Sequence, residues 1–246
     1  MNKKTVLILG AKSDMALALA YQYSQQGYSL QLAARNVDNF LKDTASDIKI
    51  RFQVDVSLHE FDIVNSSNYE NFYHSLPKSP EGVICLVGYL GDQNTAQHDA
   101  EMARKIVETN YTGPVSILNL IANDFEKRKT GWIIGISSVA GDRGRQSNYL
   151  YGSAKAGFTT FLSGLRARLS KYNVHVLTVK PGFVATAMTK DLELPPFLTA
   201  QPEQVAKDIY RAQQKHKNVI YTRWFWRWIM FIVKTIPENM FKKLNF

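Results

Sequence analysis

Tyr151 and Lys155, four residues apart, are the pair in this sequence whose types and spacing most directly suggest chemistry. On a helix, side chains four residues apart lie on one face, one turn from each other. The pKa of an ordinary tyrosine is near ~10, so its phenol is a poor acid–base group at neutral pH, but a nearby ammonium favours the phenolate. Ser138 precedes Tyr151 by thirteen residues and ends an apolar run. Its hydroxyl could hydrogen-bond the same substrate carbonyl oxygen as the tyrosine. The alternative is a Tyr–Lys pair on the solvated face of a helix, without a catalytic role. Ser138 at this distance favours an active site.

A glycine turn follows the apolar segment Thr5–Leu9 and reads Gly10-Ala11-Lys12-Ser13-Asp14-Met15-Ala16. Backbone N–H groups and the dipole at a helix start can hold a pyrophosphate there. This predicts cofactor contacts from Gly10, Lys12, Ser13, Asp14 and Met15. Only Gly10 remains of a three-glycine pattern, so an ordinary turn capped by Ser13 or Asp14 is the alternative. A carboxylate repels a pyrophosphate, and we therefore expect Asp14 to turn away and cap its own helix.

Arg35 directly follows the second expected strand, in the run Ala33-Ala34-Arg35-Asn36. In a dinucleotide-binding fold this position faces the adenosine ribose, where an acidic residue accepts from the 2′-hydroxyl and a guanidinium suits a 2′-phosphate. No acidic residue follows before Asp38, so the sequence favours NADPH over NADH. Lys12 either adds positive charge nearby or is simply solvated.

Strand-like and helix-like segments alternate along most of the chain. The expected strands are Thr5–Leu9, Tyr28–Ala34, Ile48–Val54, Gly82–Val87, Gly131–Ile136, Val174–Val179 and Asn218–Tyr221. The expected helices are Asp14–Gln26, Asn68–Leu76, Ala100–Lys127 with a bend near Gly113-Pro114, Leu150–Ser170 and Gln204–Gln214. Short apolar strands between helices are typical of a parallel sheet covered on both faces. We predict an α/β, Rossmann-type, doubly wound sheet of seven parallel strands in a single domain, residues 1–222, followed by an amphipathic tail, residues 223–246.

Ligands of such a fold bind beyond the carboxyl ends of the strands. Asp55 and Val56 directly follow the third expected strand, so we expect them beside the adenine ring. A capping role for Asp55 is the alternative.

Together these motifs resemble the short-chain dehydrogenase/reductase family over residues 4–222. The resemblance makes Ser138, Tyr151 and Lys155 the catalytic residues, and Asn110 the helix asparagine that supports the lysine through a water. The segment Pro181-Gly182-Phe183-Val184-Ala185-Thr186 is similar to the family's PGxVxT segment, whose valine and threonine contact the nicotinamide carboxamide. Gly88 matches the end of the family's NNAG motif, whose two asparagines are replaced by Cys85 and Leu86, so support of the central sheet must differ.

The resemblance implies an NADPH-dependent oxidoreductase that transfers a hydride to a carbonyl carbon, converting a ketone to a secondary alcohol. In that mechanism Tyr151 donates the proton, Lys155 lowers the pKa of the tyrosine and holds the nicotinamide ribose, and Ser138 orients the carbonyl. Family members usually pair through the helices that match residues 100–127 and 150–170, which implies a homodimer or homotetramer. The alternative is a catalytically silent NADP(H)-binding sensor or regulatory protein, against which the intact catalytic residues argue.

Composition favours a cytoplasmic globular protein without metal or disulfide. Hydrophobic residues make up 45% and charged residues 21% of the chain, which is an ordinary globular balance. The single cysteine, Cys85, lies in an apolar run, and the five histidines show no metal-ligand spacing. Thr5–Leu9 is too short for the apolar region of a signal peptide, and no run of about 18 uncharged apolar residues predicts a spanning helix.

The last fifth of the chain is basic and aromatic. Residues 201–246 carry nine Lys or Arg against three Asp or Glu, two thirds of the net charge of +9. At about 100° per residue, Arg223, Arg227 and Lys234 share a stripe roughly 40° wide, and aromatic and aliphatic residues fill the other directions until Pro237 ends the helix. Two interpretations remain open: packing on the domain or in an oligomer interface, and peripheral contact with the inner face of a membrane. The few basic residues among the aromatics argue against nucleic acid.

A narrower resemblance comes from the Gly10–Ala16 turn, the segment Gly88-Tyr89-Leu90-Gly91-Asp92-Gln93 and the aromatic, basic tail. These features are similar to a branch of the family that includes the reductases of decaprenylphosphoryl-2-keto-pentose, a polyprenyl-phosphate keto sugar. The similarity implies a lipid-linked keto substrate at the cytoplasmic membrane face. Asp191–Thr199 lies where the family usually places a mobile lid, and its Leu192, Leu194 and Phe197 suit an apolar ligand or ordinary lid packing.

Overall fold

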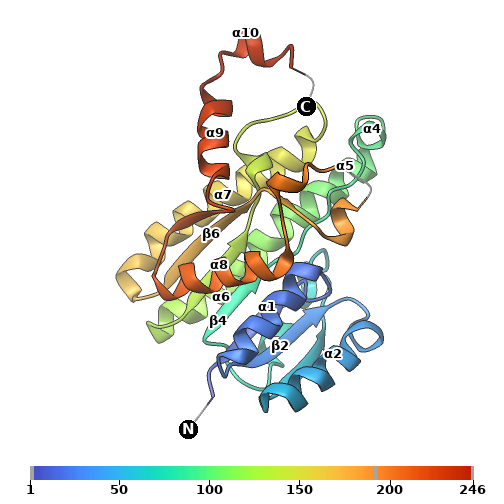
Figure 1. Cartoon of the computed structure of the whole chain (residues 1–246). Coiled ribbons are helices and arrows are strands. Elements are labelled where there is room, and N and C mark those ends of the chain that lie inside the picture. Colours follow the sequence, from blue (N-terminus) through green and yellow to red (C-terminus); the bar gives the residue numbers. More distant parts are fainter. Residues whose placement is uncertain (1–2, 191–192, 245–246) are drawn as a thin grey trace.

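A seven-stranded sheet forms the centre of the molecule (Figure 1). The computed structural model describes residues 3–190 and 193–244, apart from the Asp38 side chain. The strands are β1 (Thr5–Leu9), β2 (Ser29–Ala34), β3 (Val56–Glu60), β4 (Gly82–Cys85), β5 (Trp132–Ile136), β6 (His175–Pro181) and β9 (Val219–Thr222). They lie in the order β3-β2-β1-β4-β5-β6-β9, and all neighbours are parallel. The predicted seven-stranded Rossmann-type architecture is confirmed.

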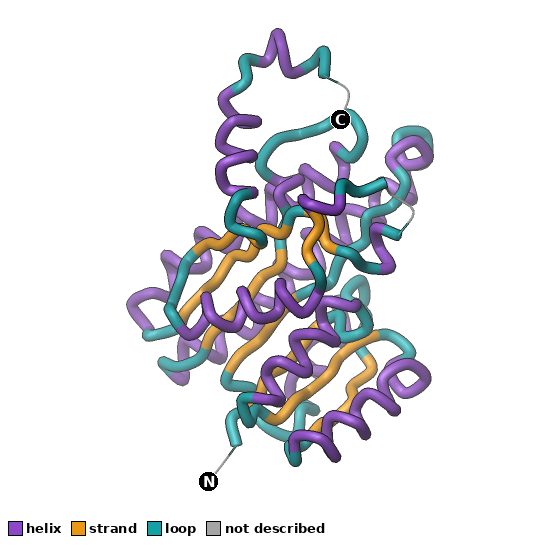
Figure 2. Tube along the Cα trace, in the orientation of Figure 1, coloured by secondary structure: helices purple, strands orange, loops and turns teal. Residues whose placement is uncertain are grey.

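Helices cover both faces of this sheet (Figure 2). The described residues form the helices α1 (Asp14–Gln25), α2 (Val37–Phe52), α3 (Tyr69–His74), α4 (Gln93–Ala96), α5 (Ala100–Val107), α6 (Gly113–Arg128), α7 (Tyr149–Leu169), α8 (Pro202–Gln214), α9 (Trp226–Thr235) and α10 (Glu238–Phe241), of which α4, α9 and α10 stand away from the sheet. α1, α2 and α8 pack on the face that includes Val6 and Ile8, and α3, α6 and α7 on the face that includes Leu7 and Leu9. Successive strand residues point to opposite faces, so a strand covered on both sides is apolar throughout.

The third strand lies later in the chain than the sequence pattern predicts. Residues 48–52 form the last part of α2, and β3 follows it. The apolar alternation across residues 48–54 is typical of a strand, but α2 buries Val37, Leu41, Ala45 and Ile48 at helical spacing and leaves Ile50 80% exposed. The strand expected over residues 48–54 is therefore wrong, because a helical face decides the fold of this segment.

The long helix expected over residues 100–127 is interrupted. A five-residue π-helix, Glu108–Thr112, joins α5 to α6, directly before the expected bend at Gly113-Pro114. Pro114 lies in the first turn of α6 and has no N–H to donate to the helical turn before it, which agrees with a change of hydrogen-bond pattern there. π-helical turns are frequent at functional sites, and this one contains Asn110, which is fully buried.

The tail packs on the domain through one side of α9. Trp226 and Met230 are buried in a small cluster with Val139. A Cβ at Gly182 would lie 2.0 Å from the Trp226 ring, so only glycine at this position admits the indole. This contact joins α9 to the segment directly after β6.

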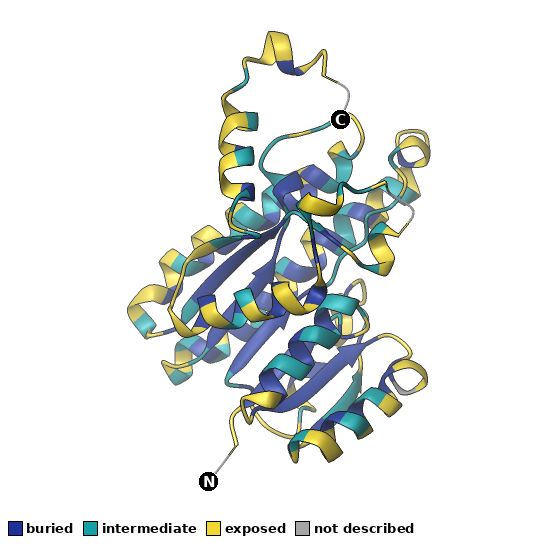
Figure 3. Ribbon diagram, in the orientation of Figure 1, coloured by how far each residue is buried: buried dark blue, intermediate teal, exposed yellow. Residues whose placement is uncertain are grey.

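The other side of α9 faces outward, at the end of the molecule opposite the N-terminus (Figures 1 and 3). Trp228, Phe231 and Ile232 are 60%, 62% and 61% exposed. Among the described residues, no helix combines the length and the apolarity needed to cross a membrane. The division at residue 222 into domain and tail stays a prediction.

Candidate active site

The candidate site lies at the edge of the sheet where the parallel strands end. Gly10, Gly88, Ser138 and Gly182 stand in the segments directly after β1, β4, β5 and β6, which are neighbours in the sheet. Because all four strands run in the same direction, these segments meet at one edge. The fold therefore brings together motifs that are far apart in the sequence.

Ser138 and Tyr151 are joined by a side-chain hydrogen bond. Ser138 caps the 3₁₀ turn Val139–Gly141 and accepts from the Ala140 N–H at 3.1 Å, which orients its hydroxyl. Tyr151 lies in the first turn of α7. Burial raises the pKa of Tyr151 to about 12, and the hydrogen bond with Ser138 opposes that increase. The phenol is therefore protonated at neutral pH, the state that a proton donor requires.

Lys155 lies one turn further along α7 and is only 3% exposed. Its ammonium donates to the Ile136 carbonyl at 3.1 Å and lies 5.7 Å from the centre of the Tyr151 ring. Ser137 donates to the Lys155 carbonyl at 2.9 Å and so holds α7 against the end of β5. Burial lowers the pKa of Lys155 to about 8, and Cys85 opposes the decrease. The lysine still carries its charge at neutral pH, beside the phenol whose ionised form it favours.

Asn110 and Gly88 pack next to this lysine. The Asn110 amide donates to the carbonyls of Tyr89 and Ile106 at 2.6 and 2.8 Å, and its oxygen accepts from the Tyr89 N–H at 3.2 Å. A Cβ at Gly88 would lie 3.4 Å from the Asn110 oxygen and 3.6 Å from the Lys155 ammonium. Asn110 thus anchors the segment after β4 against the lysine. Its support of Lys155 through a water stays a prediction.

Ser13 caps α1, and Asp14 does not. The Ser13 hydroxyl accepts from the Ala16 N–H at 3.2 Å, and Gly10 adopts a φ of 87°, which favours glycine. The Asp14 carboxylate instead accepts from the Ala187 N–H at 2.7 Å, across 173 residues of sequence. The expectation that Asp14 caps its own helix is wrong, because Ser13 already serves as the cap and the turn after Thr186 offers a backbone donor.

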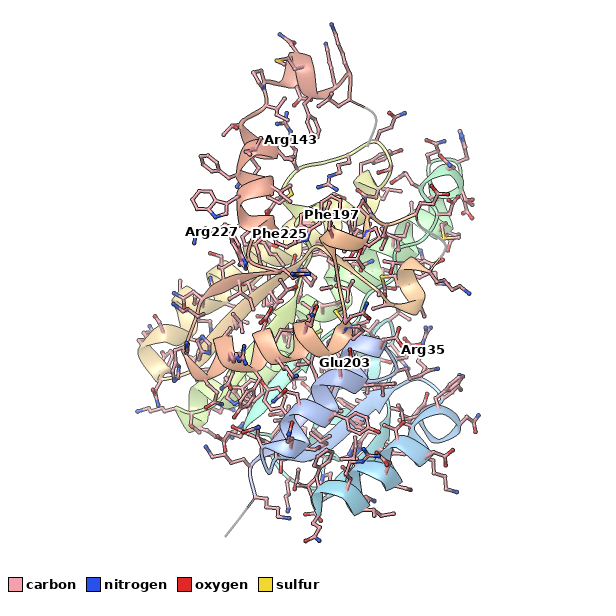
Figure 4. All side chains as sticks on the ribbon, viewed as in Figure 1. Arg35, Arg143, Phe197, Glu203, Phe225 and Arg227 are labelled. Atoms are coloured by element: carbon pink, nitrogen blue, oxygen red, sulfur yellow. The ribbon has the colours of Figure 1, made fainter. Side chains whose placement is uncertain are left out.

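Arg35 is exposed between α1 and α2 (Figure 4), and no described side chain forms an ion pair with it. The Lys12 ammonium lies 3.4 Å from the centre of the Phe40 ring. Glu60, which the sequence analysis missed, accepts from the Asn36 and Val37 N–H groups at 2.9 and 3.1 Å and so caps α2. No local signal in the sequence reveals this contact, because Glu60 and the start of α2 are 24 residues apart in the sequence. Arg35 and Lys12 remain as the cations for an anion at this edge.

Asp55 and Val56 lie at the opposite end of the parallel strands, where the strands begin. β3 begins at Val56, which pairs with Leu30 of β2, so both residues stand where the strand starts and not where it ends. Asp55 forms an ion pair with Lys78 at 3.6 Å. Their assignment to the adenine is wrong, and the error follows from the misplaced third strand. Of the residues after β3, Phe61, Asp62, Ile63 and Val64 line a cavity of about 650 Å³.

Of the predicted Pro181–Thr186 segment, Thr186 lines the same cavity, whereas Pro181, Gly182 and Val184 lie outside its lining. Pro181 ends β6, and the Gly182 N–H donates to the Thr222 carbonyl at 3.0 Å. Val184 is buried in β7 (Phe183–Val184), which pairs with β8 (Thr199–Ala200). Thr186 begins the 3₁₀ turn that Asp14 contacts.

The expected lid is described only in part. Asp191 and Leu192 lie outside the described residues. Leu194 lines a cavity of about 620 Å³ that also touches Asp14 and Thr186, whereas Phe197 is exposed. The Leu198 carbonyl accepts from the Trp226 indole at 3.3 Å, which connects this segment to α9.

A cavity of about 650 Å³ lies between the segments that follow the strands. Eight of the residues predicted to bind the cofactor line it: Gly10, Lys12, Ser13, Asp14, Met15, Arg35, Gly88 and Thr186. Its volume is in the range of small-molecule sites, the start of α1 presents backbone donors, and Arg35 and Lys12 add positive charge. These features fit a phosphorylated dinucleotide.

Comparisons with known proteins identify relatives along nearly the whole chain. The family described as short chain dehydrogenase matches residues 4–195. Over 242 residues the chain is 35% identical to an uncharacterized oxidoreductase of Mycobacterium tuberculosis, covering 97% of this chain and 96% of that protein. The chain belongs to the short chain dehydrogenase family. It is therefore an NAD(P)-dependent oxidoreductase that acts on CH–OH or C=O groups.

Solved structures of short chain dehydrogenases share its fold. A short-chain dehydrogenase from Sphingobium yanoikuyae in complex with NADPH has a TM-score of 0.82 and 22% identity, over 96% of this chain and 97% of that one. The L-sorbose reductase of Gluconobacter frateurii, in complex with NADPH and L-sorbose, has a TM-score of 0.79 and 20% identity, over 90% and 95% of the two chains. At these identities the likeness concerns the fold.

Lys155→Met removes the buried charge and is expected to stabilise the protein at neutral pH. The pKa of Lys155 is about 8 in the folded protein and 10.5 for an ordinary lysine, so the unfolded chain binds more protons between these values and wild-type stability rises with pH across that window. Below pH 8 the buried charge lowers the free energy of unfolding by its full amount, about 3 kcal/mol. Urea unfolding without nucleotide at pH 7 and pH 10 measures the difference in unfolding free energy between Lys155→Met and the wild type. This difference should be smaller at pH 10. A difference that does not change with pH would contradict the low pKa.

Proposed function

We propose that this protein is an NADPH-dependent carbonyl reductase that converts a ketone to a secondary alcohol. The observation that carries the proposal is a protonated Tyr151 next to the buried, charged Lys155, with Ser138 hydrogen-bonded to the tyrosine. The nicotinamide, when bound, supplies the hydride. Ser138 and Tyr151 bind the carbonyl oxygen, Tyr151 gives it a proton, and the Lys155 charge stabilises the phenolate that remains. Asn110 keeps the segment after β4 against the lysine.

A sensor that binds NADP(H) without chemistry agrees less well with this geometry. Burying an ammonium destabilises a fold unless hydrogen bonds and charges compensate it. Within the described part of the chain, the Lys155 ammonium makes one hydrogen bond, to the Ile136 carbonyl. Nucleotide binding would use the lysine without a phenol beside it, whereas proton transfer requires both.

Arg35 and Lys12 support the preference for NADPH over NADH. Both line the cofactor cavity at the end of β2 and the start of α1. The acid next to them, Glu60, is bound by the N–H groups that start α2. The 2′-phosphate of NADPH would lie near two cations there. The 2′-hydroxyl of NADH would lack an acceptor, because the Glu60 carboxylate is already hydrogen-bonded.

The tail supports a lipid-linked keto sugar as the substrate and a peripheral position at a membrane. The outer side of α9 exposes Trp228, Phe231 and Ile232, and Arg227 and Lys234 lie on the same helix. Aromatic and basic residues together suit the headgroup boundary of an anionic bilayer. The inner side of α9 contacts the lid segment at Leu198, so a docked α9 would hold the lid near the lipid. We further infer a homodimer or homotetramer formed through α5, α6 and α7.

Tyr151→Phe removes only the phenolic hydroxyl that donates the proton. We expect turnover to fall by about 10²–10⁴-fold, because general acid catalysis is lost, while NADPH binding changes by less than about twofold. NADPH absorbance with a panel of ketones measures turnover, and fluorescence titration measures binding. Turnover that persists in this variant would overturn the assignment.

Arg35→Ala should change the selectivity between the two coenzymes. Loss of a charged hydrogen-bond donor corresponds to about 1.5–3 kcal/mol, so kcat/KM for NADPH should fall about 10–100-fold while that for NADH stays unchanged. Arg51→Ala is the matched control, because Arg51 is an exposed cation of α2 that pairs with Asp47. Equal losses for both coenzymes would argue against a 2′-phosphate contact.

Replacing Phe231 and Ile232 by serine should release the protein from anionic vesicles. Each side chain loses apolar contact worth about 1.5–3 kcal/mol if it enters the lipid, so cosedimentation with phosphatidylglycerol/phosphatidylcholine vesicles should weaken at least about tenfold. Ile50→Ser, at an 80% exposed position on α2, is the control. Unchanged cosedimentation together with a smaller particle mass in light scattering would assign this face to self-association instead.

A further inference from the structure

A buried carboxylate lies directly after the turn that Ser138 caps. One oxygen of Asp142 forms an ion pair with the Lys180 ammonium, and the other accepts from the Tyr221 hydroxyl at 2.7 Å. The side chains of Lys180 and Asp142 are only 11% and 3% exposed. Asp142 therefore has two partners on the sheet, because Lys180 belongs to β6 and Tyr221 to β9.

These two partners are neighbours in the sheet. Lys180 and Tyr221 pair in the parallel register of β6 and β9, and the ammonium lies 5.5 Å from the centre of the Tyr221 ring. Burial raises the pKa of Tyr221, and the hydrogen bond to Asp142 adds to this increase. The phenol therefore keeps its proton and stays a donor, so both strands hold the same carboxylate.

The next arginines of the loop are bound to the tail. Arg143 donates to two carbonyls at the end of α9, at 2.6 Å each, and Arg145 contacts the Met230 sulfur at 3.4 Å. Their surroundings differ from those of Asp142, which connects the same loop to the strands.

Asp142 is also tied to Ser138 through the backbone of the turn. The Gly141 N–H donates to the Ser138 carbonyl and the Asp142 N–H to the Val139 carbonyl, both at 3.1 Å. Successive turn bonds leave the backbone between residues 138 and 142 little freedom. A displacement of the carboxylate would therefore move Ser138 and its hydroxyl.

The turn packs on α7 as well. A Cβ at Gly141 would lie 2.7 Å from the carbonyl carbon of Lys155 and from the backbone nitrogen of Ala156. The turn thus contacts the helix that carries Tyr151 through Gly141, and the sheet through Asp142. The position of Ser138 relative to Tyr151 depends on both contacts.

Stability alone does not account for an ion pair at this place. Burying two charges costs desolvation free energy, and well-packed apolar side chains often stabilise a fold equally well. Hydrogen bonds between charged groups are directional, so they fix a position more narrowly than apolar contacts do. An ion pair four residues after Ser138 therefore suggests a role in the geometry of the site.

We propose that the Asp142 carboxylate is a positioning group for Ser138, fixed by its two partners on the sheet. It holds the turn so that the Ser138 and Tyr151 hydroxyls reach the same carbonyl oxygen of the substrate. The inference rests on the proposed reductase function, which assigns that oxygen to these two hydroxyls. Asp142 acts through the turn, without contact with the reacting atoms.

Asp142→Asn keeps the shape of the side chain and removes its charge. A misplacement of about 1 Å can cost about 10²-fold in rate, so we expect kcat to fall about 10–100-fold, while the Kd of NADPH changes by less than about twofold. NADPH absorbance measures turnover of the ketone that the wild type reduces fastest in the panel, and fluorescence titration measures binding.

A double-mutant cycle with Ser138→Ala separates positioning from a general loss of structure. In the Ser138→Ala background, Asp142→Asn should change kcat by less than about twofold, because no hydroxyl is left to position. A loss of the same size in both backgrounds would overturn the proposal.

Tyr221→Phe is a milder variant that keeps the ion pair, so it tests the proposal even where Asp142→Asn does not fold. Loss of one hydrogen bond to the carboxylate should lower kcat about threefold or more. Tyr73→Phe is the matched control, because the Tyr73 hydroxyl donates to Asp124 at 2.7 Å between α3 and α6. It loses the same type of bond and should keep the wild-type kcat. Equal losses in the two variants would argue against a role specific to Ser138.

Amide hydrogen exchange tests the turn without turnover. The N–H groups of Ala140, Gly141 and Asp142 are bonded within the turn at 3.1 Å each. Their exchange should be at least about fivefold faster in Asp142→Asn than in the wild type, and unchanged in Tyr73→Phe. Exchange in Asp142→Asn as slow as in the wild type would refute the positioning role even where turnover falls.

The reductase function itself fails separately. Full turnover in both Ser138→Ala and Tyr151→Phe would refute that function, and the role of Asp142 with it. Loss of turnover in those two variants, together with an unchanged kcat in Asp142→Asn, would refute the positioning role alone.

Discussion

The buried ammonium of Lys155 is the constraint on which the arrangement of the site depends. A charge this far from water needs polar partners, and the parallel sheet supplies one where β5 ends, at the Ile136 carbonyl. Ser137 then fixes α7 to the same strand end. Gly88 packs beside the ammonium, and the π-helical turn buries Asn110 next to it. Each of these contacts positions the lysine, and the lysine in turn sets the charge beneath Tyr151.

The tail is part of the site's scaffold as well as a surface. Trp226 fills the space left by Gly182, and Arg143 ties the end of α9 to the loop between Ser138 and Tyr151. One ten-residue helix therefore packs on the domain with its inner face and exposes tryptophan, phenylalanine and isoleucine on the other. This geometry is compatible with both interpretations that the sequence left open, packing of the tail and contact with a membrane. Packing uses one face of the helix, and the second face stays exposed.

The turn after β1 shows how a departure from the usual glycine pattern is accommodated. A carboxylate at Asp14 would repel a pyrophosphate, yet its hydrogen bond to the Ala187 N–H ties it to the segment after Thr186. The same bond connects the start of α1 to the segment that leads into the lid. Ser13 takes over the capping of α1. A residue that weakens the motif in the sequence thus serves as a link between two walls of the cavity.

The sequence by itself determined what depends on local periodicity and spacing: the doubly wound sheet, most of its strands, and the placement of Ser138, Tyr151 and Lys155. A strand buried on both faces must be apolar throughout, and a helix must bring residues four apart together, so both can be inferred locally. The third strand could not, because an alternating run at residues 48–54 satisfies two periodicities and only packing on the sheet selects the helix. The partner of Asp14 and the different surroundings of Arg143 and Arg145 could not be inferred locally either. Those depend on contacts between segments that are distant in the chain, which only the tertiary structure brings together.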